Sequence, residues 1–549
     1  MKRRHFLGST AAAALCLPAS GQELGRELSA DVVIIGGSLG GCAAALAALK
    51  HGLRVILTEE TDWIGGQLTS QGVPPDEHAW IETHGATKRY REFRDEIRNY
   101  YCRHYPLTDS ARADAHLNPG LGSVSRLCHE PRVALAVLQE AMAPYQSSGH
   151  LKVLLEREPI SAEVDGDVTR SVLVRSLANG NEQVLRAPSF VDATELGDLL
   201  PLTKTEYVCG AEGRAATGER HAPEARDPQN QQAFTVCFAM DHLPGESHVM
   251  DEPVDYAFWR DHVPALTPPW PGKLLDWKYT HPRSGQPKKL GFNPTGDRHD
   301  GVVNLWTYRR IAAQASFRPG TYQSDICLVN WPQNDYFLKS IIDVTPEEKR
   351  QRIAQGKQLS LSLLYWMQTE APRLDGGVGF PGLRLRADIM GTEDGLAKYP
   401  YVRESRRVLA ETTILESHCG KADREKAESY RDSVGIGYYP IDLHPSTAGD
   451  NYIDFDALPF QIPLGALLPQ RMENVFPACK NIGATHVTNG CYRLHPVEWG
   501  IGEAVGCLLA FARLRRTSPR AIRANEKLLG EFQAFLQKDG VEIAWPATS

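Results

Sequence analysis

The stretch DVVIIGGSLGG, residues Asp31–Gly41, joins a run of β-branched residues to a glycine-rich loop. The run Val32–Ile35 predicts a central parallel strand that is buried on both faces. Small residues and leucines at helical spacing follow the loop and stop at Gly52, which predicts a helix with a glycine cap. The next segment, LRVILTEE at residues 53–60, predicts a second buried strand that ends in acidic residues. These pieces make a strand–turn–helix–strand unit of about 30 residues, which is typical of nucleotide-binding folds.

The glycine loop has the residue types that a bound pyrophosphate requires. Gly36 permits the tight turn, and Gly41 lets the helix lie close to the sheet. The helix N-terminus offers free N–H groups to phosphate, and Glu59 at the end of the second strand is placed to bind ribose hydroxyls. Ser38 departs from the usual glycine, and its hydroxyl adds a group that can bond the phosphate. We therefore predict a nucleotide site, rather than a plain parallel sheet, at Gly36, Gly37, Ser38, Gly40, Gly41 and Glu59.

Three later segments resemble parts of FAD-dependent oxidoreductases with the glutathione-reductase-like fold. The pair Gly65–Gly66 resembles the double glycine that follows the ribose-binding acid, and ATELGD at residues 193–198 resembles a string that lies close to the FAD, interrupted here by a glutamate and a leucine. After a strand at residues 474–479 and an irregular polar loop, an alanine-rich helix is expected to open at Gly502–Glu503 and to point its positive end at the flavin ring. The resemblance adds these predicted FAD-binding residues: Gly65, Gly66, Gln67, Ala193, Thr194, Asp198, Gly502 and Glu503.

Longer motifs carry the resemblance to one family. WIGGQLTSQGVPPDEH, residues 63–78, and THVTNGCYRLHPVEWGIGEAVG, residues 485–506, are similar nearly throughout to segments of a bacterial FAD-dependent oxidoreductase family. NLWTYRRI at residues 304–311 and PYVRESRRV at residues 400–408 also resemble internal segments of that family. The resemblance covers most of the chain after its first residues. It implies FAD and a two-domain fold, but it implies no particular substrate.

The positions of these motifs predict the organisation of the chain. The expected fold class is α/β, with a Rossmann-like, glutathione-reductase-like FAD-binding domain assembled from discontinuous segments and an α+β substrate-binding insertion. Residues 151–192 predict a strand, then an antiparallel meander with turns at Asp165–Gly166 and Asn179–Gly180, and then a further strand. The predicted parts are an export signal and linker at residues 1–28, FAD-binding segments at 29–215 and 400–525, the insertion at 216–399, and a C-terminal helix and tail at 526–549.

The insertion and a nearby arginine segment hold candidate binding residues with two interpretations each. The insertion contains Trp259, Trp270, Trp277, Trp306 and Trp331, whose rings would either line a pocket or pack in the core. Residues 400–407 hold Arg403, Glu404, Arg406 and Arg407, which would either bind an anion or brace an interface through ion pairs.

Polar residues crowd the segment between the last predicted strand and helix, and we expect the chemistry there. Oxidation of a substrate by flavin needs a base, and imidazole has a suitable pKa, so His486 or His495 is the expected base. Arg493 is the expected anchor, because a cation near the flavin or the product lowers the barrier. A structural hydrogen bond is the alternative role of each histidine. The predicted catalytic residues are His486, Tyr492, Arg493 and His495, and no metal site is predicted, since the adjacent Asp76, Glu77 and His78 cannot all face one ion.

The N-terminus reads as an export signal. Basic residues at positions 2–4 precede an apolar run at residues 11–17 and a small-residue region near Gly21. Arg3–Arg4 followed by Phe6–Leu7 resembles the twin-arginine motif, and an ordinary secretory signal is the alternative. We therefore expect a periplasmic or secreted protein whose mature chain starts near Gln22 and has no membrane span.

Composition excludes several function classes. The net charge of −7 provides no basic field for nucleic acid. Ten cysteines follow Cys16 and none forms a CxxC pair, which disfavours a disulfide scaffold and a disulfide reductase but leaves one or two bridges open.

The predicted function is that of an exported FAD-dependent oxidoreductase, a dehydrogenase or oxidase. Its substrate would be a polar small molecule that carries a hydroxyl or amine, such as a sugar, and that loses hydride to flavin N5. The electrons would leave to oxygen, a quinone or a periplasmic carrier. Nicotinamide is not expected as a partner, because no second complete glycine fingerprint lies between Asp198 and Pro400. A flavin-bearing electron-transfer or binding protein without its own substrate chemistry is the alternative.

Overall fold

The computed structural model describes residues 25–294 and 302–546. The twin-arginine motif and the apolar run of the predicted signal therefore lie outside the described residues. Strand β1 (Gly25–Ser29), which begins within the predicted linker, already pairs with a strand of the body.

A five-stranded parallel sheet forms the centre of the nucleotide-binding region. Its order is β23-β8-β2-β3-β4, so the first strand of the glycine unit, β2, lies in the middle. Val33 of β2 pairs with Ile56 on one side and Phe190 on the other. The predicted parallel strands are thus confirmed, as β2 (Val32–Ile35), β3 (Val55–Thr58), β4 (Leu151–Leu154), β8 (Ser189–Asp192) and β23 (Val475–Pro477).

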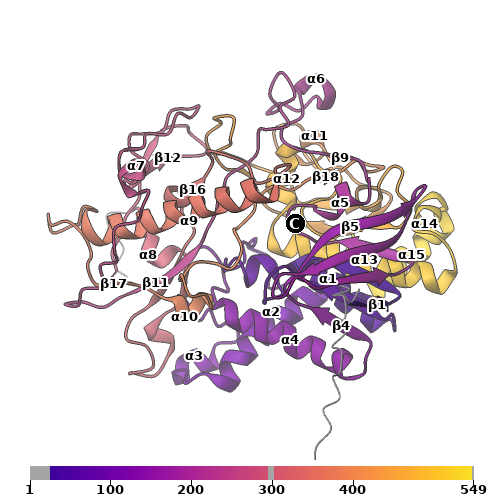
Figure 1. Ribbon diagram of the computed structural model, residues 1–549, viewed down its shortest axis with the longest axis horizontal. Coiled ribbons are helices and arrows are strands. Elements are labelled where there is room, and N and C mark those ends of the chain that lie inside the picture. Colours follow the sequence, from indigo (N-terminus) through magenta and orange to yellow (C-terminus); the bar gives the residue numbers. More distant parts are fainter. Residues whose placement is uncertain (1–24, 295–301, 547–549) are drawn as a thin grey trace, which may run out of the picture.

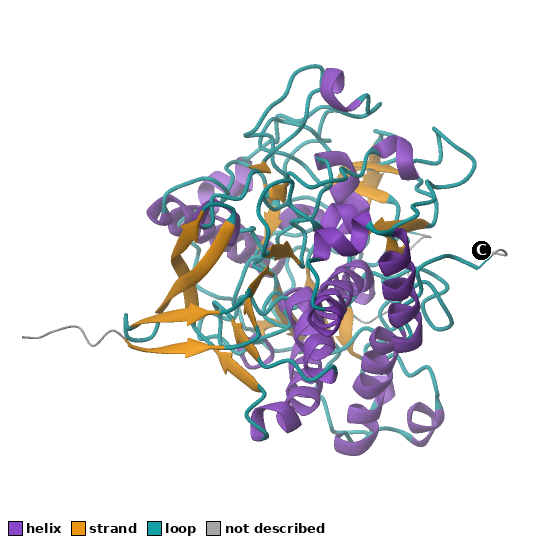
Figure 2. Ribbon diagram, turned by 90° about the vertical axis from the view of Figure 1, so that its right-hand side faces the viewer, coloured by secondary structure: helices purple, strands orange, loops and turns teal. Residues whose placement is uncertain are grey.

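Helices cover one face of this sheet, and a four-stranded sheet that contains the antiparallel meander covers the other. Val32 and Ile34 belong to a core shared with helix α1 (Leu39–Lys50) and helix α13 (His495–Arg515). Val33 and Ile35 point the other way and pack against the meander, because side chains alternate along a strand. Viewed from the side, helices run alongside one another and strands lie next to them (Figure 2).

The meander follows the predicted turns. It consists of β5 (Arg157–Asp165), β6 (Val168–Ser176) and β7 (Glu182–Arg186), and β1 completes a sheet of order β1-β7-β6-β5. Gly166 and Gly180 have positive φ angles at the two turns. The meander prediction is therefore confirmed.

A second region surrounds another sheet, on the left of Figure 1. Its order is β14-β15-β11-β17, and all of its pairs are antiparallel. Phe238 and Met240 face a core with many aromatic residues, whereas Cys237 and Ala239 face the core of the nucleotide-binding region. This sheet therefore lies between the two cores. Its strands, with the long helix beside it, are β11 (Phe238–His242), β14 (Arg310–Ala312), β15 (Ile326–Val329), β17 (Leu383–Leu385) and α9 (Pro346–Thr369).

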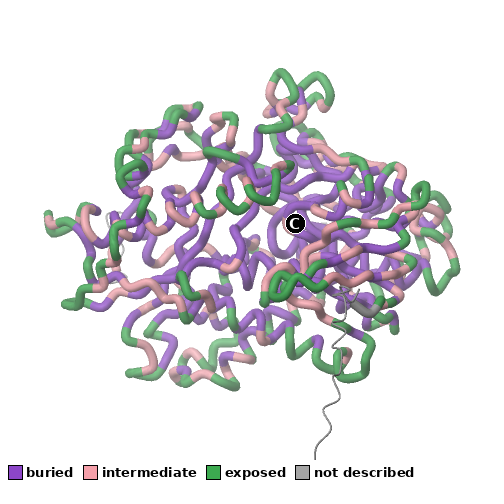
Figure 3. The backbone as a smooth tube through the Cα atoms, in the orientation of Figure 1, coloured by how far each residue is buried: buried purple, intermediate pink, exposed green. Residues whose placement is uncertain are grey.

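The other helices and strands complete these layers. Exposed residues lie mostly at the periphery (Figure 3). The remaining elements are α2 (Lys88–His104), α3 (Asp109–Ala113), α4 (Pro131–Ser147), α5 (Leu199–Leu202), β9 (Tyr207–Val208), α6 (Arg214–Thr217), β10 (Phe234–Thr235), α7 (Tyr256–Asp261), β12 (Lys278–Thr280), β13 (Pro287–Lys289), α8 (Leu305–Tyr308), β16 (Asp335–Tyr336), α10 (Ala387–Met390), β18 (Arg407–Val408), α11 (Glu416–Cys419), β19 (Ser433–Gly437), β20 (Ile441–Leu443), β21 (Ile453–Phe455), β22 (Phe460–Pro463), α12 (His486–Tyr492), α14 (Pro519–Ala524) and α15 (Glu526–Asp539).

Two expectations for the C-terminal part were wrong. Helix α13 begins at His495, about two turns before the expected start at Gly502–Glu503, because Pro496 favours the first turn of a helix. The irregular polar loop before it contains helix α12, which Thr485 caps. Gly502 instead lies where α13 crosses the glycine loop, since a Cβ there would come within 2.0 Å of the carbonyl oxygen of Gly40. Helix α15 ends before Gly540, which adopts the left-handed conformation.

Tryptophans and cysteines are largely interior. Trp259, Trp270, Trp277 and Trp306 are buried in the core of the second region, so for these four the packing interpretation holds. The ten cysteines of the described chain are free thiols. Within the described ranges, the helices are too short or too polar to cross a membrane.

Candidate functional site

The glycine loop brings two predicted segments into direct contact. Gly36 has φ +97°, and a Cβ at this position would lie 2.2 Å from the carbonyl oxygen of Ala193. Only glycine therefore lets the loop after β2 approach the loop after β8 so closely. The N–H of Gly65 donates to the carbonyl of Gly37 at 2.7 Å, which adds the predicted double glycine to the same place.

Ser38 and Glu59 organise this loop. The hydroxyl of Ser38 accepts a hydrogen bond from the N–H of Gly41 at 3.2 Å and so caps α1. Glu59 Oε2 accepts from the N–H of Gly37 at 2.9 Å, and its Oε1 accepts from the N–H of Thr61 at 2.8 Å. Burial raises the pKa of Glu59 to about 8.

A narrow cavity beside the loop is lined by six of the predicted nucleotide-binding residues. Thr194 Oγ1 donates to Asp192 at 2.7 Å, and the N–H of Asp198 donates to Thr194 Oγ1 at 2.7 Å. This network orders the loop after β8 opposite Glu59. The cavity walls include Gly36, Ser38, Glu59, Ala193, Thr194 and Asp198.

A buried chain of hydrogen bonds runs from the loop into helix α13. Glu498 Oε1 accepts from the N–H of Gly40 at 2.9 Å. The Gln67 amide donates to the other oxygen of Glu498 and to the carbonyl of Arg493, the latter at 3.0 Å. Lys480 pairs with Glu195 and lies 3.6 Å from Glu498. The start of α13 is thus bonded to the glycine loop.

A larger cavity of about 350 Å³ lies beyond Arg493. Three buried arginines in its wall each pair with a carboxylate: Arg309 with Asp76 at 3.1 Å, Arg403 with Asp335 at 3.1 Å, and Arg493 with Asp442 at 3.0 Å. Tyrosines and Trp331 add aromatic surface. A volume of this size is that of a small-molecule site.

Asp335 is the centre of the polar groups on one side of this cavity. It receives His444 Nδ1 at 2.5 Å and the hydroxyl of Tyr452 in addition to Arg403. Burial alone would raise the pKa of Asp335, but Arg403 and His444 outweigh burial and hold the pKa at about 2. His444 Nε2 lies 3.4 Å from Asp442. Burial likewise would raise the pKa of Asp442, but His444 and Arg493 hold it well below its usual range.

The predicted catalytic residues occupy different places. Arg493 lines the larger cavity. His495 Nδ1 accepts from the N–H of Asp76 at 3.0 Å, and its buried Nε2 has no partner among the described residues. Burial lowers the pKa of His495 to about 4, so the ring is neutral at pH 7 and carries its proton on Nε2.

His486 and Tyr492 bond to the protein away from either cavity wall. His486 Nδ1 lies 3.0 Å from Glu404. Burial would lower the pKa of His486, but the carboxylate of Glu404 outweighs burial and raises it. The Tyr492 hydroxyl donates to the carbonyl of Gln461 at 2.9 Å. Their predicted roles in catalysis stay predictions.

The arginine segment divides between the two interpretations. Arg406 pairs with Asp198 and Asp343, both at 2.8 Å, and Arg407 pairs with Glu404 at 2.6 Å. These two arginines brace the loop after β8 and helix α12. Arg403 alone reaches the larger cavity.

A family model now decides the identity of the chain. The model described as FAD dependent oxidoreductase matches residues 31–536. The chain belongs to this family. It is an FAD-dependent oxidoreductase, and FAD is its cofactor.

Solved structures with weaker likeness were also found. The E. coli quinol fumarate reductase FrdA variant aligns over 93% of this oxidoreductase and 74% of its own chain, with 11% identity and a TM-score of 0.34. L-proline dehydrogenase from P. horikoshii aligns over 34% of this chain and 24% of its own (17% identity, TM-score 0.18), and the flavin-dependent monooxygenase PieE over 39% and 35% (16%, 0.24). The oxidoreductase therefore spans less than half the length of the latter two chains. No curated protein matches it significantly.

The residues of the oxidoreductase fit FAD. The cradle at Gly36 admits no side chain, and Glu59 presents carboxylate oxygens at the ribose position of the motif. Leu39 starts α1 with an N–H that has no intrahelical acceptor, as a pyrophosphate site requires. Two buried side-chain atoms, Ser405 Oγ and His495 Nε2, have no partner among the described residues.

Several residues that line the larger cavity or lie behind its wall were missed in the sequence. Asp335, Asp442 and His444 come from short elements or loops in which no motif marks them. Arg309 lies in the NLWTYRRI segment, so the resemblance of this segment to the family was a signal in the sequence for this residue. Spacing along the chain could not bring these residues together.

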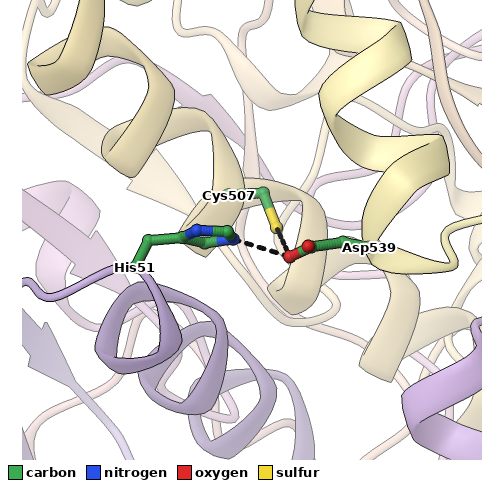
Figure 4. Close-up of side chains that lie close together, drawn as sticks. All are labelled: His51, Cys507 and Asp539. Atoms are coloured by element: carbon green, nitrogen blue, oxygen red, sulfur yellow. Dashed lines mark hydrogen bonds and ion pairs between the residues drawn. The ribbon is translucent and has the colours of Figure 1, made fainter.

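Two groups of side chains have metal-ligand chemistry, and charged partners already hold both. His51, Cys507 and Asp539 converge where α1, α13 and α15 meet (Figure 4). Asp539 there binds His51 at 2.6 Å and Lys50 at 3.1 Å. In the other group, Glu195, Cys479 and Glu498, the Lys480 ammonium occupies the centre. Asp76, Glu77 and His78 bond separately to Arg309, Arg94 and the carbonyl of Gly85.

Proposed function

We propose that this oxidoreductase oxidises a polar small molecule that carries a hydroxyl or an amine, held in the larger cavity. One observation carries the proposal: Gly40, Glu498, Gln67 and Arg493 form a continuous hydrogen-bonded link from the glycine loop to the cavity wall. A cofactor held by the loop and a substrate held at Arg493 would then share one rigid wall. When bound, FAD supplies the acceptor for the hydride that the substrate carbon loses.

His444 is the base that the geometry favours. Its Nδ1 faces the ionised Asp335 at 2.5 Å, which favours the proton on Nδ1, and its Nε2, 3.4 Å from Asp442, is the atom that would accept a proton. A base with this arrangement takes the proton from the substrate hydroxyl or amine as the hydride leaves. His495 has the opposite arrangement, since its Nδ1 accepts from Asp76 and its neutral Nε2–H is a donor. We therefore assign His495 a donor role.

Arg493 and Asp442 would orient the reacting group. The guanidinium of Arg493 is held by Asp442 at 3.0 Å, and the backbone carbonyl of Arg493 accepts from the Gln67 amide at 3.0 Å. This double attachment fixes the cation relative to the glycine loop. A fixed cation stabilises the negative charge that develops during oxidation without reorganising.

The arrangement of the sheets and the N-terminal sequence support two further parts of the proposal. A parallel sheet with helices on one face and an antiparallel meander on the other agrees with a glutathione-reductase-like arrangement. The basic and apolar N-terminal segment supports export by the twin-arginine route to the periplasm or beyond. Oxygen, a quinone or a small periplasmic carrier would then take the electrons.

Anaerobic mixing of the purified holoenzyme with hydroxyl- and amine-bearing compounds tests the proposal. A substrate bleaches the flavin absorbance, and NADH and NADPH leave it unchanged. His444→Gln should slow bleaching by about 10²–10⁴-fold and keep FAD bound. His281→Gln is the control, because His281 also borders the cavity but bonds Ser284 at 3.0 Å. Bleaching by NADPH, or full speed in His444→Gln, would contradict the proposal, and a flavin that no compound reduces would favour electron transfer alone.

A further inference from the structure

The larger cavity has an imbalance between hydrogen-bond donors and acceptors. Among its described lining residues, the buried side-chain atoms without a partner are Nε of Arg309, Arg403 and Arg493, Nδ2 of Asn330 and Nε1 of Trp331. Each of these atoms is a donor. Buried donors without partners are costly, so a native ligand is expected to satisfy some of them.

Arg309 shows the imbalance most clearly. Its guanidinium carries five N–H donors, and Asp76 Oδ1 at 3.1 Å is the hydrogen-bond partner found for it within the described residues. Its side chain is nine-tenths buried. Asp76 also donates its N–H to His495, so its position is fixed from two sides. The guanidinium of Arg309 is therefore ordered, and most of its N–H donors have no acceptor among the described residues.

Arg403 and Asn330 form a second donor group in the same wall. Arg403 Nη2 donates to Asn330 Oδ1 at 3.1 Å, which turns the Asn330 amide nitrogen away from the arginine. That nitrogen has no partner. Asp335 holds Arg403 from behind at 3.1 Å. The pair thus offers donors from two side chains that are already locked in place.

We propose that the substrate of this cavity carries a carboxylate, which Arg309, Arg403 and Asn330 bind. This inference rests on the oxidation proposed above and names the substrate class. A carboxylate only accepts hydrogen bonds, and arginine binds it through two parallel N–H groups. The hydroxyls of a neutral polyol must also donate, and the carboxylates of Asp76 and Asp442 in this wall already pair with Arg309 and Arg493.

The reaction balances for a hydroxy or amino acid. The carbon bearing the hydroxyl or amine loses a hydride, with both electrons of its C–H bond, to bound FAD. The hydroxyl or amine proton goes to His444 Nε2, and a carbonyl or imine forms. The carboxylate is unchanged and serves as the anchor. In the same cavity wall, Asp442 pairs with Arg493 at 3.0 Å and lies 3.4 Å from His444 Nε2, so a cation stands beside the proposed base.

Matched pairs of probes test the substrate class on the oxidised holoenzyme. The acids lactate, alanine, gluconate and malonate are compared with lactamide, alaninamide, sorbitol and malonamide. Binding is measured by the shift of the visible flavin spectrum, and reaction by anaerobic bleaching. At least one acid should bind 10-fold or more tightly than its neutral partner. Equal or weaker binding of all four acids at concentrations up to about 100 mM would overturn the inference.

Asn330→Asp tests the proposed anchor without removing a buried charge partner. The new carboxylate has the shape of the amide and still accepts from Arg403, but it replaces a donor with a like charge. We expect the dissociation constant of the best acid to rise about 10- to 100-fold, since a hydrogen bond to a charged group is lost, while the FAD content stays the same. The control is Asn181→Asp on the exposed turn between β6 and β7, which makes the same chemical change away from the cavity. Unchanged acid binding in Asn330→Asp would overturn the inference.

The outcomes separate this inference from the proposed oxidation. Bleaching by sorbitol or an amide as readily as by the acid would keep the oxidation and reject the carboxylate anchor. The opposite outcome has two parts: an acid binds tightly and loses this binding in Asn330→Asp, and no compound bleaches the flavin. This outcome would keep the carboxylate anchor and reject the oxidation.

Discussion

The glycine loop and the larger cavity are built in different ways. Most of the loop, from β2 through Glu59, comes from one continuous stretch of about 30 residues. The wall of the cavity comes from segments that contain Asp76, Arg309, Arg403 and His444, which are separated by many elements. The glycine loop depends on the spacing of its residues along the chain. The cavity wall forms only when several separate loops fold against one another.

This difference changes what single substitutions should do. In the loop, backbone atoms approach one another so closely that one added methyl group is harmful. In the cavity, paired charges hold each other, and removal of one partner leaves another buried and uncompensated. Substitutions in the glycine loop and in the larger cavity should therefore differ in their effects.

Gly36→Ala should have the largest effect. A Cβ would lie 2.2 Å from the Ala193 oxygen, and the backbone has φ +97°. Strain and overpacking together should cost roughly 2–5 kcal/mol and abolish FAD retention. Gly52→Ala is the matched control, because Gly52 also has a positive φ but has nothing within 4 Å of its Cβ. It should cost only about 1 kcal/mol. Flavin absorbance per chain and denaturant unfolding give the result, and equal losses in both variants would contradict the close-contact argument.

Acid should destabilise the protein around the start of α13 through His495. Its pKa is about 4 in the folded state and near 6.5 when unfolded, so the unfolded chain binds the proton first. The free energy of unfolding should therefore fall as pH decreases from about 6.5 to 4, by up to about 3 kcal/mol.

His495→Gln should reduce this pH dependence, since glutamine can still accept from Asp76 but does not titrate. Unfolding in urea at several pH values provides the measurement. Val497→Ala on the same helix is the control, because it removes packing without removing a titratable group. An unchanged slope in His495→Gln would contradict the assignment.

Glu59→Ala should weaken FAD binding about 10- to 100-fold, because the carboxylate positions Gly37 and faces the ribose. Glu59→Gln should retain part of the affinity through its carbonyl oxygen. Equilibrium dialysis of the FAD-free protein against FAD measures the change. The control Asp62→Ala alters an exposed acid three residues away that pairs with Lys398. Equal FAD affinity in Glu59→Ala and the control would show that the acid does not contribute.

Asp539→Ala should have the smallest effect. Asp539 ties α15 to the end of α1 through Lys50 and His51, which are partly exposed (Figure 4). Partly exposed ion pairs contribute about 1 kcal/mol or less. FAD content should not change, and thermal unfolding should show only a small decrease in Tm. Loss of FAD in this variant would point to a role for this group beyond attachment.

Much of the nucleotide-binding region could be predicted from sequence, and its errors have clear causes. Runs of β-branched residues located the central parallel strands, and turn residues located the meander. The start of α13 was misplaced because the small residues around Gly502 suggested a helix start, whereas they provide close packing against Gly40. The hydroxyl of Ser38 caps α1, and its bond to a phosphate stays a prediction. The tryptophans could not be divided between core and pocket, because an aromatic ring has the same sequence signal in both.

The sequence alone determined the glycine unit, the cofactor and the family, because each depends on residue types at short spacing and the physics of a tight turn is local. Only the tertiary structure decided which side chains form the larger cavity. Asp335 gathers Arg403, His444 and Tyr452 from separate parts of the chain. Those bonds form only when the second sheet and the C-terminal segments pack together, and burial then gives Asp335 and His495 the pKa values that set their charges.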